Sequence, residues 1–306
     1  MILITGVSGL LGANLLFAAE GHGYEVTGVY RQHAMHFPAA ETVRADLTRP
    51  GAASDLLRSR KPEWVIHCAA ATDVDWCEDH PKDALKTNVD ATRRLAVAAR
   101  SIGARFVYIS TDAVFDGKGG PYGEGDPSRP VNVYGETKAE GERATRAELP
   151  QCLIVRTNIY GWSVQETKPS LAEWVLGQLE TGSRVPGFQD VTFTPILVND
   201  FGDILLELLD RGLEGIYHVA GSEALTKYRF AQRVAARFGY PEDAVLPATL
   251  GGSKLRAPRP RSTPLRTDLV RKVLGRDLPD VSVGLMRFKQ LRDEGYLDKL
   301  KACRGW

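Results

Sequence analysis

The sequence predicts an α/β fold with a doubly wound parallel sheet, and two observations lead to it. Short, unbroken apolar runs recur through the first half, and segments of helical periodicity separate most of them. Strands buried on both faces read as continuous apolar runs, and right-handed helical crossovers place them in one parallel sheet. The predicted strands are Ile2–Thr5, Glu25–Tyr30, Thr42–Ala45, Trp64–Cys68, Arg105–Ile109 and Leu153–Thr157.

The helices between these strands are clearest at Leu10–Ala19 and Pro81–Ile102. The second half is less regular and is expected to be mainly helical. Its predicted elements are helices at Ser170–Glu180, Asp200–Arg211, Thr226–Phe238 and Val281–Asp293, and a strand at Ile216–Val219. We therefore expect a sheet domain over 1-158, to which segments near 196-220 return, and a smaller region over 159-306.

The composition excludes several classes of function. A net charge of +1 over 306 residues leaves no surplus of positive charge for nucleic acid or an acidic membrane. No apolar stretch approaches the ~18 residues that span a bilayer. The start "MILITG" lacks a basic n-region, so no signal peptide is expected. The four cysteines show no zinc spacing, and two lie in apolar runs, which fits a reducing cytoplasm.

Three glycines, Gly6, Gly9 and Gly12, separate the first strand from the first helix. In a dinucleotide-binding turn the first allows the tight bend, the second admits a pyrophosphate, and the third lets helix and strand pack closely. The N–H groups that open the helix, at Leu10 and Leu11, then face the phosphates. A strand-to-helix turn that happens to contain glycine is the alternative, but the position after the first strand favours dinucleotide binding.

The end of the second strand, "VTGVYRQH", indicates which dinucleotide binds. NAD sites usually place Asp or Glu there for the ribose 2′-hydroxyl, and this stretch has neither. Arg31 is placed to pair with a 2′-phosphate. We therefore expect NADP(H) to be preferred, with NAD(H) and a solvated loop arginine as the alternatives.

Two later stretches carry the candidate chemistry. In "YGETKAEGE", Tyr134 and Lys138 are four residues apart and share a helix face. A lysine ammonium beside a phenol lowers its pKa and suits the tyrosine to proton exchange with a carbonyl. Thr111, in "YISTDAVFDG", is expected in a loop leaving the fifth strand, in reach of the same oxygen. A solvated helix face is the alternative for the Tyr–Lys pair taken alone.

The chain resembles the extended short-chain dehydrogenase/reductases, and within them the dTDP-4-dehydrorhamnose reductase family. The resemblance rests on "HCAAATDVDWCE", "STDAVFDG", "PVNVYGETKAEGE", "LIVRTNIYG" and "RPRSTPLRT", in this order. It implies a Rossmann domain and the catalytic trio Thr111, Tyr134 and Lys138. It also implies cofactor contacts at the glycine turn and at Asp46, Leu47, Ala69, Ala70 and Ala71. The implied substrate contacts are Thr72, Thr111, Asp112, Asn158 and Arg261, the last of these toward a diphosphate.

Two departures from the family pattern leave the sugar open. Ala113 stands where the family usually has Tyr, and Ile159 stands where it has Trp. Both changes remove an aromatic stacking face. Trp162 is the nearest candidate to compensate, although packing in the core is an equal alternative for it.

The sequence thus predicts an NAD(P)H-dependent reductase of a 4-keto nucleotide sugar. A nucleotide-sugar epimerase or dehydratase, or a non-catalytic NADP-binding regulatory subunit, are the alternatives. A homodimer is one of the oligomeric states that remain open. The acidic cluster Asp73, Asp75, Glu78 and Asp79 is interpreted as a solvated helix start, so no metal is expected. His67 and His218 are interpreted as core histidines.

Overall fold

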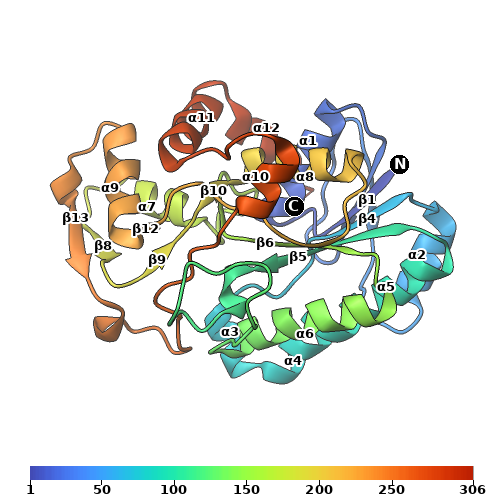
Figure 1. Ribbon diagram of the computed structural model, residues 1–306. Helices are drawn as coiled ribbons and strands as arrows, with labels where there is room; N and C mark the ends of the chain where they lie inside the picture. The colour runs from blue at the N-terminus through green and yellow to red at the C-terminus, as the bar shows by residue number, and fades with distance from the viewer. Residues whose placement is uncertain (306) are drawn as a thin grey trace.

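The computed structural model describes residues 1–305 and contains a seven-stranded, wholly parallel sheet (Figure 1). Along the sheet lie β11 (Gly215–His218), β6 (Leu153–Thr157), β5 (Arg105–Thr111), β4 (Trp64–His67), β1 (Ile2–Thr5), β2 (Val26–Tyr30) and β3 (Glu41–Arg44). The order of the strands changes direction between β1 and β4, and in such open parallel sheets ligands bind beyond the carboxyl ends of the strands at that point. The predicted doubly wound fold is confirmed, with every predicted strand present.

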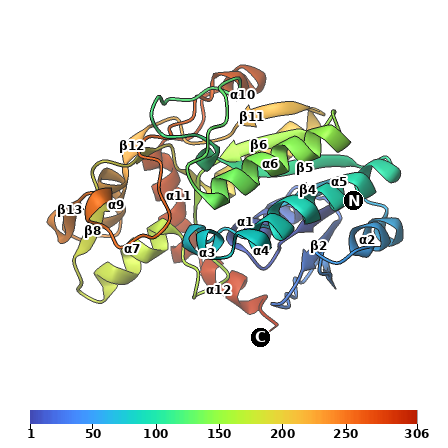
Figure 2. The same ribbon diagram turned by 90° about the horizontal axis from the view of Figure 1, so that it is seen from below.

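Helices cover both faces of the sheet (Figure 2). On one face α1 (Leu10–Gly21) packs against α8 (Val198–Asp210). On the other lie α2 (Ala52–Arg60), α5 (Ala91–Ser101) and α6 (Val133–Glu148), packed side by side. Apolar residues of the strands alternate between the two cores, Leu3 and Val65 facing α2 and α5 while Ile2 and Ile66 face α1.

The helix predicted over Pro81–Ile102 is interrupted. It consists of α4 (Pro81–Leu85), a π-helical turn at Lys86–Asp90, and α5. The π turn brings the buried side chain of Asn88 toward the sheet edge, where its amide donates to the Ala71 carbonyl oxygen at 3.0 Å. Such single-turn π bulges are frequent at functional sites.

The second region contains short strands and helices beside the sheet. Its strand pairs are β7 (Ile159–Tyr160) with β10 (Ile196–Leu197), β9 (Thr192–Phe193) with β12 (Leu225–Thr226), and β8 (Val185–Phe188) with β13 (Val245–Ala248). Its helices are α7 (Leu171–Glu180), α9 (Lys227–Arg237), α10 (Asp268–Leu274), α11 (Val281–Asp293) and α12 (Tyr296–Ala302). The predicted boundary at residue 158 stays a prediction.

The segment after α12 returns to the first region. Met35 and Arg304 form an antiparallel bridge, and the N–H of His36 donates to the Cys303 carbonyl oxygen at 2.8 Å. The Gly305 N–H donates to the Ala34 carbonyl oxygen at 3.0 Å. Late residues therefore hold the loop that follows β2. Within residues 1–305, no helix has the length and apolarity needed to cross a membrane.

Candidate active site

The glycine turn is fixed by close backbone packing. Gly6 has φ of +74°, and a Cβ there would lie 2.8 Å from the Cα of Ala69. A Cβ on Gly12 would lie 2.3 Å from the Gly6 carbonyl oxygen. Only glycine fits at either position, because the first has a left-handed backbone and the second touches backbone.

The N-terminus of α1 suits a dinucleotide pyrophosphate. Among residues 1–305, no side chain caps the helix at Gly9, and its first turn holds no acidic residue. A Cβ on Gly9 would meet only the Gly6 carbonyl oxygen, at 3.3 Å, so the turn is open on that side. Uncapped N–H groups, at Leu10 and Leu11 among others, with a positive dipole end form an anion site.

The segment from Ala69 to Ala71, after β4, is held at the same edge. The N–H of Ala69 donates to Thr5 Oγ1 at 3.1 Å, and the N–H of Ala71 donates to Asn88 Oδ1 at 2.8 Å. Asn88 also donates to Thr137 Oγ1 in α6 at 3.0 Å. Asn88 was missed by sequence reasoning, since it lies inside what reads as a continuous helix.

At the adenosine end, Arg31 is exposed just after β2, and Arg44 donates to its carbonyl oxygen at 3.2 Å. Burial alone would raise the pKa of Asp46. Hydrogen bonds from Thr48 and the nearby charges of Arg31 and Arg49 outweigh it and lower that pKa. Arg31 and Arg49 therefore lie close to the Asp46 carboxylate, at the end of the sheet where the adenosine ribose is expected.

Thr111 and Tyr134 meet at the carboxyl end of β5. Thr111 lies on the strand itself, paired with Thr157, rather than in the predicted loop, because β5 continues beyond Ile109. Tyr134 lies in the first turn of α6, with its phenol close enough to Thr111 for hydrogen bonding to that hydroxyl to act on its pKa. The Thr111 hydroxyl itself donates to Asp112 Oδ1 at 3.2 Å. The strand and the helix start therefore place the two hydroxyls together.

Lys138 lies one turn further along α6, but it does not lower the pKa of Tyr134 as the sequence predicts. Burial raises the pKa of Tyr134, and only the hydrogen bond with Thr111 acts against this. Lys138 Nζ instead donates to the Ile109 carbonyl oxygen at 2.7 Å and lies 4.1 Å from the centre of the Tyr108 ring. Burial lowers the pKa of Lys138 itself to about 8, so the side chain is still mostly an ammonium at neutral pH.

A buried ion pair lies beneath these groups. Arg156 Nη2 and Nε donate to Glu142 at 2.7 and 2.9 Å, and Ser110 Oγ donates to the same carboxylate at 2.5 Å. The carboxylate joins β6 to β5 and α6, and the last two are the elements that carry Thr111 and Tyr134. Sequence reasoning missed this pair, since nothing in the spacing of Glu142 and Arg156 indicates contact.

The predicted substrate residues Asp112 and Asn158 bind each other. Asp112 is buried and accepts from Asn158 Nδ2 at 2.8 Å and from Thr263 Oγ1 at 2.7 Å. Burial raises its pKa, although these hydrogen bonds act to lower it. The nearby Lys227 opposes that rise with its charge, and sequence reasoning missed this lysine. Thr72 and Arg261 are exposed, and Arg261 lies 3.7 Å from Asp190.

Trp162 packs in the core and is not the compensating aromatic side chain considered above. It is 4% exposed, its ring stacks on Phe288 at 4.0 Å, and its Nε1 donates to the Phe288 carbonyl oxygen at 2.9 Å. Trp162 therefore does not replace the aromatic stacking faces that are missing at Ala113 and Ile159.

The remaining polar residues have structural partners. His67 contacts Thr5 Oγ1 at 2.8 Å and Thr92 Oγ1 at 3.0 Å, and His218 is fully buried. In the acidic cluster, Asp75 binds Arg259 at 3.0 Å, and Asp79 binds Arg256. Among residues 1–305, no three His, Cys, Asp or Glu side chains are arranged to hold a metal.

Comparison with known proteins identifies the family. A family model described as the RmlD substrate binding domain matches residues 1–291. The chain belongs to this family. This RmlD-family chain is 33% identical over 279 residues to a probable low-salt glycan biosynthesis reductase, Agl14, of Haloferax volcanii, covering 90% of this chain and 93% of the relative.

A solved structure agrees with the RmlD assignment. The dTDP-4-dehydrorhamnose reductase of Bacillus anthracis in complex with NADP is 26% identical, with a TM-score of 0.84 over 94% of this chain and 98% of the other. The predicted family and class, nicotinamide-dependent oxidoreductases, are confirmed. A second kind of relative is the methionine adenosyltransferase 2 subunit beta of Bos taurus, which is 31% identical over 86% of this chain and 79% of its own length.

Proposed function

We propose that this protein is an NADPH-preferring reductase of a 4-keto nucleotide sugar. The observation that carries the proposal is that Tyr134, in the first turn of α6, lies near Thr111 at the carboxyl end of β5, with Lys138 one helical turn away. The glycine turn lies at the same sheet edge, so a dinucleotide along α1 extends toward these hydroxyls.

Each residue of the trio has a separate task. When bound, the nicotinamide cofactor supplies the hydride that reduces the carbonyl carbon. Tyr134 donates a proton to the carbonyl oxygen, since its raised pKa keeps it protonated at neutral pH. Thr111 orients that oxygen through its hydroxyl group. Lys138 is proposed to bind the nicotinamide ribose, with the Ile109 carbonyl oxygen holding its ammonium in place.

The preference for NADPH rests on Arg31. A guanidinium pairs with a 2′-phosphate, whereas the carboxylate typical of NAD sites repels it. The position of Arg31 beside Arg44, with no acidic residue at the end of β2, supports this preference.

The substrate class rests on the second region. Arg259 lies close enough to Lys227 for its charge to act on the pKa of that lysine, which also interacts with the buried Asp112. Two neighbouring cations suit a diphosphate, and Arg261 is proposed to reach it from the exposed side. Ala113 and Ile159 leave the sugar without the family's usual stacking faces, so a sugar other than dehydrorhamnose fits the proposal equally.

The alternative is a regulatory subunit, which the relatives named methionine adenosyltransferase 2 subunit beta favour. A panel of dTDP-, UDP- and GDP-linked 4-keto sugars with NADPH distinguishes the two. We expect cofactor oxidation with at least one of them. NADPH binding with no turnover of any would favour the regulatory subunit.

Tyr134→Phe is the first test of the mechanism. Losing a general acid should reduce kcat by about 10²-fold. The dissociation constant for NADPH should stay near that of the wild type, because the hydroxyl is not required for dinucleotide binding. A variant that turns over at the wild-type rate would show that Tyr134 is not the acid.

A further inference from the structure

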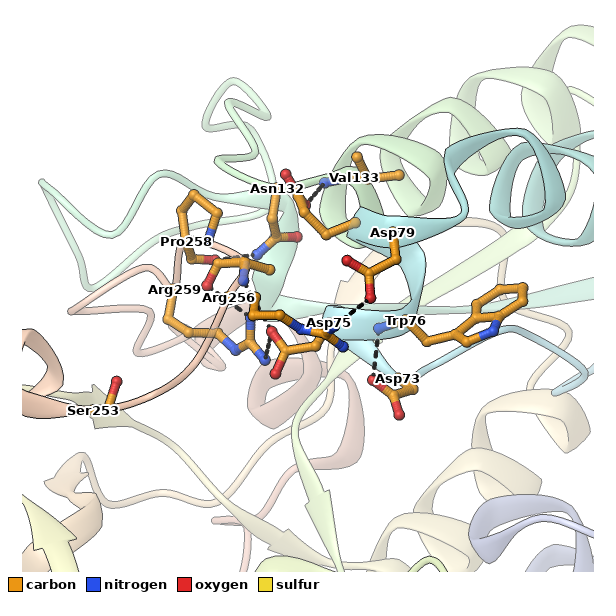
Figure 3. A network of polar contacts seen from close by, with 12 residues as sticks. Asp73, Asp75, Trp76, Asp79, Asn132, Val133, Ser253, Arg256, Pro258 and Arg259 are labelled. Carbon is orange, nitrogen blue, oxygen red and sulfur yellow. Dashed lines mark hydrogen bonds and ion pairs between the residues drawn. The ribbon is translucent and has the colours of Figure 1, made fainter.

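A strap of residues 256–263 leaves the second region and is bound to the first (Figure 3). Asp75 in α3 (Val74–Asp79) accepts from the backbone N–H of Ala257 at 2.9 Å and from Arg259 at 3.0 Å. The acidic cluster and the arginine-rich stretch of the sequence therefore form one contact. The strap carries Arg259 and Arg261, the cations proposed above for the diphosphate.

Asn132 connects this strap to the helix that carries Tyr134. It is 3% exposed and is the N-cap of α6, where its Oδ1 accepts from the Gly135 N–H at 2.8 Å. Its Nδ2 donates to the Pro258 carbonyl oxygen at 2.8 Å. One amide thus binds the first turn of α6 through its oxygen and the strap through its nitrogen.

The far end of the strap reaches the other side of the same site. Thr263 donates to Asp112, which adjoins Thr111, at 2.7 Å. A Cβ on Gly117 would lie 2.6 Å from the Arg261 nitrogen, so the loop after Asp112 lies directly against the strap. The strap therefore contacts both segments that place the Thr111–Tyr134 pair.

We propose that Asn132 is a positioning residue that couples the strap to Tyr134, so that a diphosphate bound by the strap's arginines holds Tyr134 in place for proton transfer. The effect of this coupling on turnover rests on the proposed function, whereas the contacts that form it do not. Small misplacements of a proton donor reduce rates strongly, since catalysis depends on near-attack geometry.

Asn132→Ser separates the two tasks of the amide. Serine caps helices about as well as asparagine, but it has no donor long enough to reach Pro258. We expect an unchanged NADPH affinity, a slightly lower Tm because the Pro258 carbonyl oxygen loses its donor, a fall in kcat of about 10-fold, and a smaller change in KM. Asn132→Ala, which removes the cap as well, should lower Tm further. If Asn132→Ser keeps the wild-type kcat, the coupling is absent.

Hydrogen–deuterium exchange tests the coupling without any sugar. Asp75→Ala should speed exchange in residues 256–263 and, through Asn132, in residues 132–137 of the free protein. Asp55→Ala, which removes an exposed ion pair within α2 and contacts neither segment, is the matched control and should change neither. Faster exchange in the strap alone would overturn the proposal.

These measurements separate the two proposals. If no keto sugar is reduced but Asp75→Ala loosens both segments, the coupling holds and the proposed function fails. If wild type and Asn132→Ser reduce the sugar equally, the proposed function holds and the coupling fails. In the double variant Asp75→Ala/Asn132→Ser, kcat should equal that of the worse single variant, since both act through one strap.

Discussion

The two ends of the site are built differently. The cofactor end is a local device, in which a strand, three glycines and one helix stand within the first 21 residues. The sugar end joins segments far apart in the chain, as the contact between Asp112 and Thr263, 151 residues away, shows. The geometry of the cofactor end can therefore be predicted from sequence spacing, whereas the geometry of the sugar end depends on tertiary contacts.

Gly12→Ala tests how strictly the cofactor end is fixed, and we expect the largest effect from it. The new Cβ would lie 2.3 Å from the Gly6 carbonyl oxygen, which cannot move without displacing the turn. Overpacking against backbone should cost about 3 kcal/mol or more of unfolding free energy and abolish NADPH binding.

Gly21→Ala, in the same helix, is the control. A Cβ there meets nothing within 4 Å, so stability should be unchanged or slightly higher. Urea unfolding and NADPH fluorescence titration measure both variants. Equal stability for the two would mean that the turn tolerates a side chain.

Acid stability depends on two buried histidines of the central sheet, His67 in β4 and His218 in β11. Burial lowers the pKa of both His67 and His218 to about 3, from 6.5. Below pH 6.5 the unfolded chain binds protons at these two histidines, whereas the folded chain does not. The free energy of unfolding therefore decreases as pH decreases. Each histidine should contribute about 1.4 kcal/mol per pH unit below that value.

Replacing either histidine by Asn should remove about half of this pH dependence, whatever the change in absolute stability. The measurement is the free energy of unfolding from pH 7 to pH 5. An unaltered slope in both variants would show that neither histidine stays neutral in the folded protein.

Arg31→Asp tests whether Arg31 selects NADPH over NADH at the adenosine end. A carboxylate repels the 2′-phosphate and accepts from a 2′-hydroxyl. The ratio of kcat/KM for NADPH to that for NADH should fall by about 10-fold or more, the scale of one charge contact. Arg49→Asp, in the loop that follows β3, should change the ratio less. An unchanged ratio in Arg31→Asp would indicate that Arg31 is a solvated loop residue that does not contact the cofactor.

The smallest effect is expected at the sugar end. Ala113→Tyr with Ile159→Trp restores the two stacking faces that the family usually has. An aromatic face contributes roughly 1 kcal/mol, so KM for a dTDP-4-keto-6-deoxyhexose should decrease severalfold. A higher KM would indicate that the pocket accommodates a different sugar at these positions.

Sequence reasoning succeeded where spacing reflects one element. The strands, the glycine turn and the Tyr134–Lys138 helix face follow from short-range periodicity. It failed where a side chain acts across elements. The π turn at Asn88, the Glu142–Arg156 pair and the orientation of Lys138 depend on neighbours that no local pattern encodes.

The return of late segments to the early sheet also constrains synthesis on the ribosome. The inner face of α1 packs against α8, and the loop at Ala34 pairs with Gly305. A nascent chain of the first 190 residues therefore exposes the apolar face of α1 and an unpaired edge at β6. Until Val198–His218 emerges, both surfaces lack their partners, and exposed apolar surface and unpaired strand edges favour aggregation.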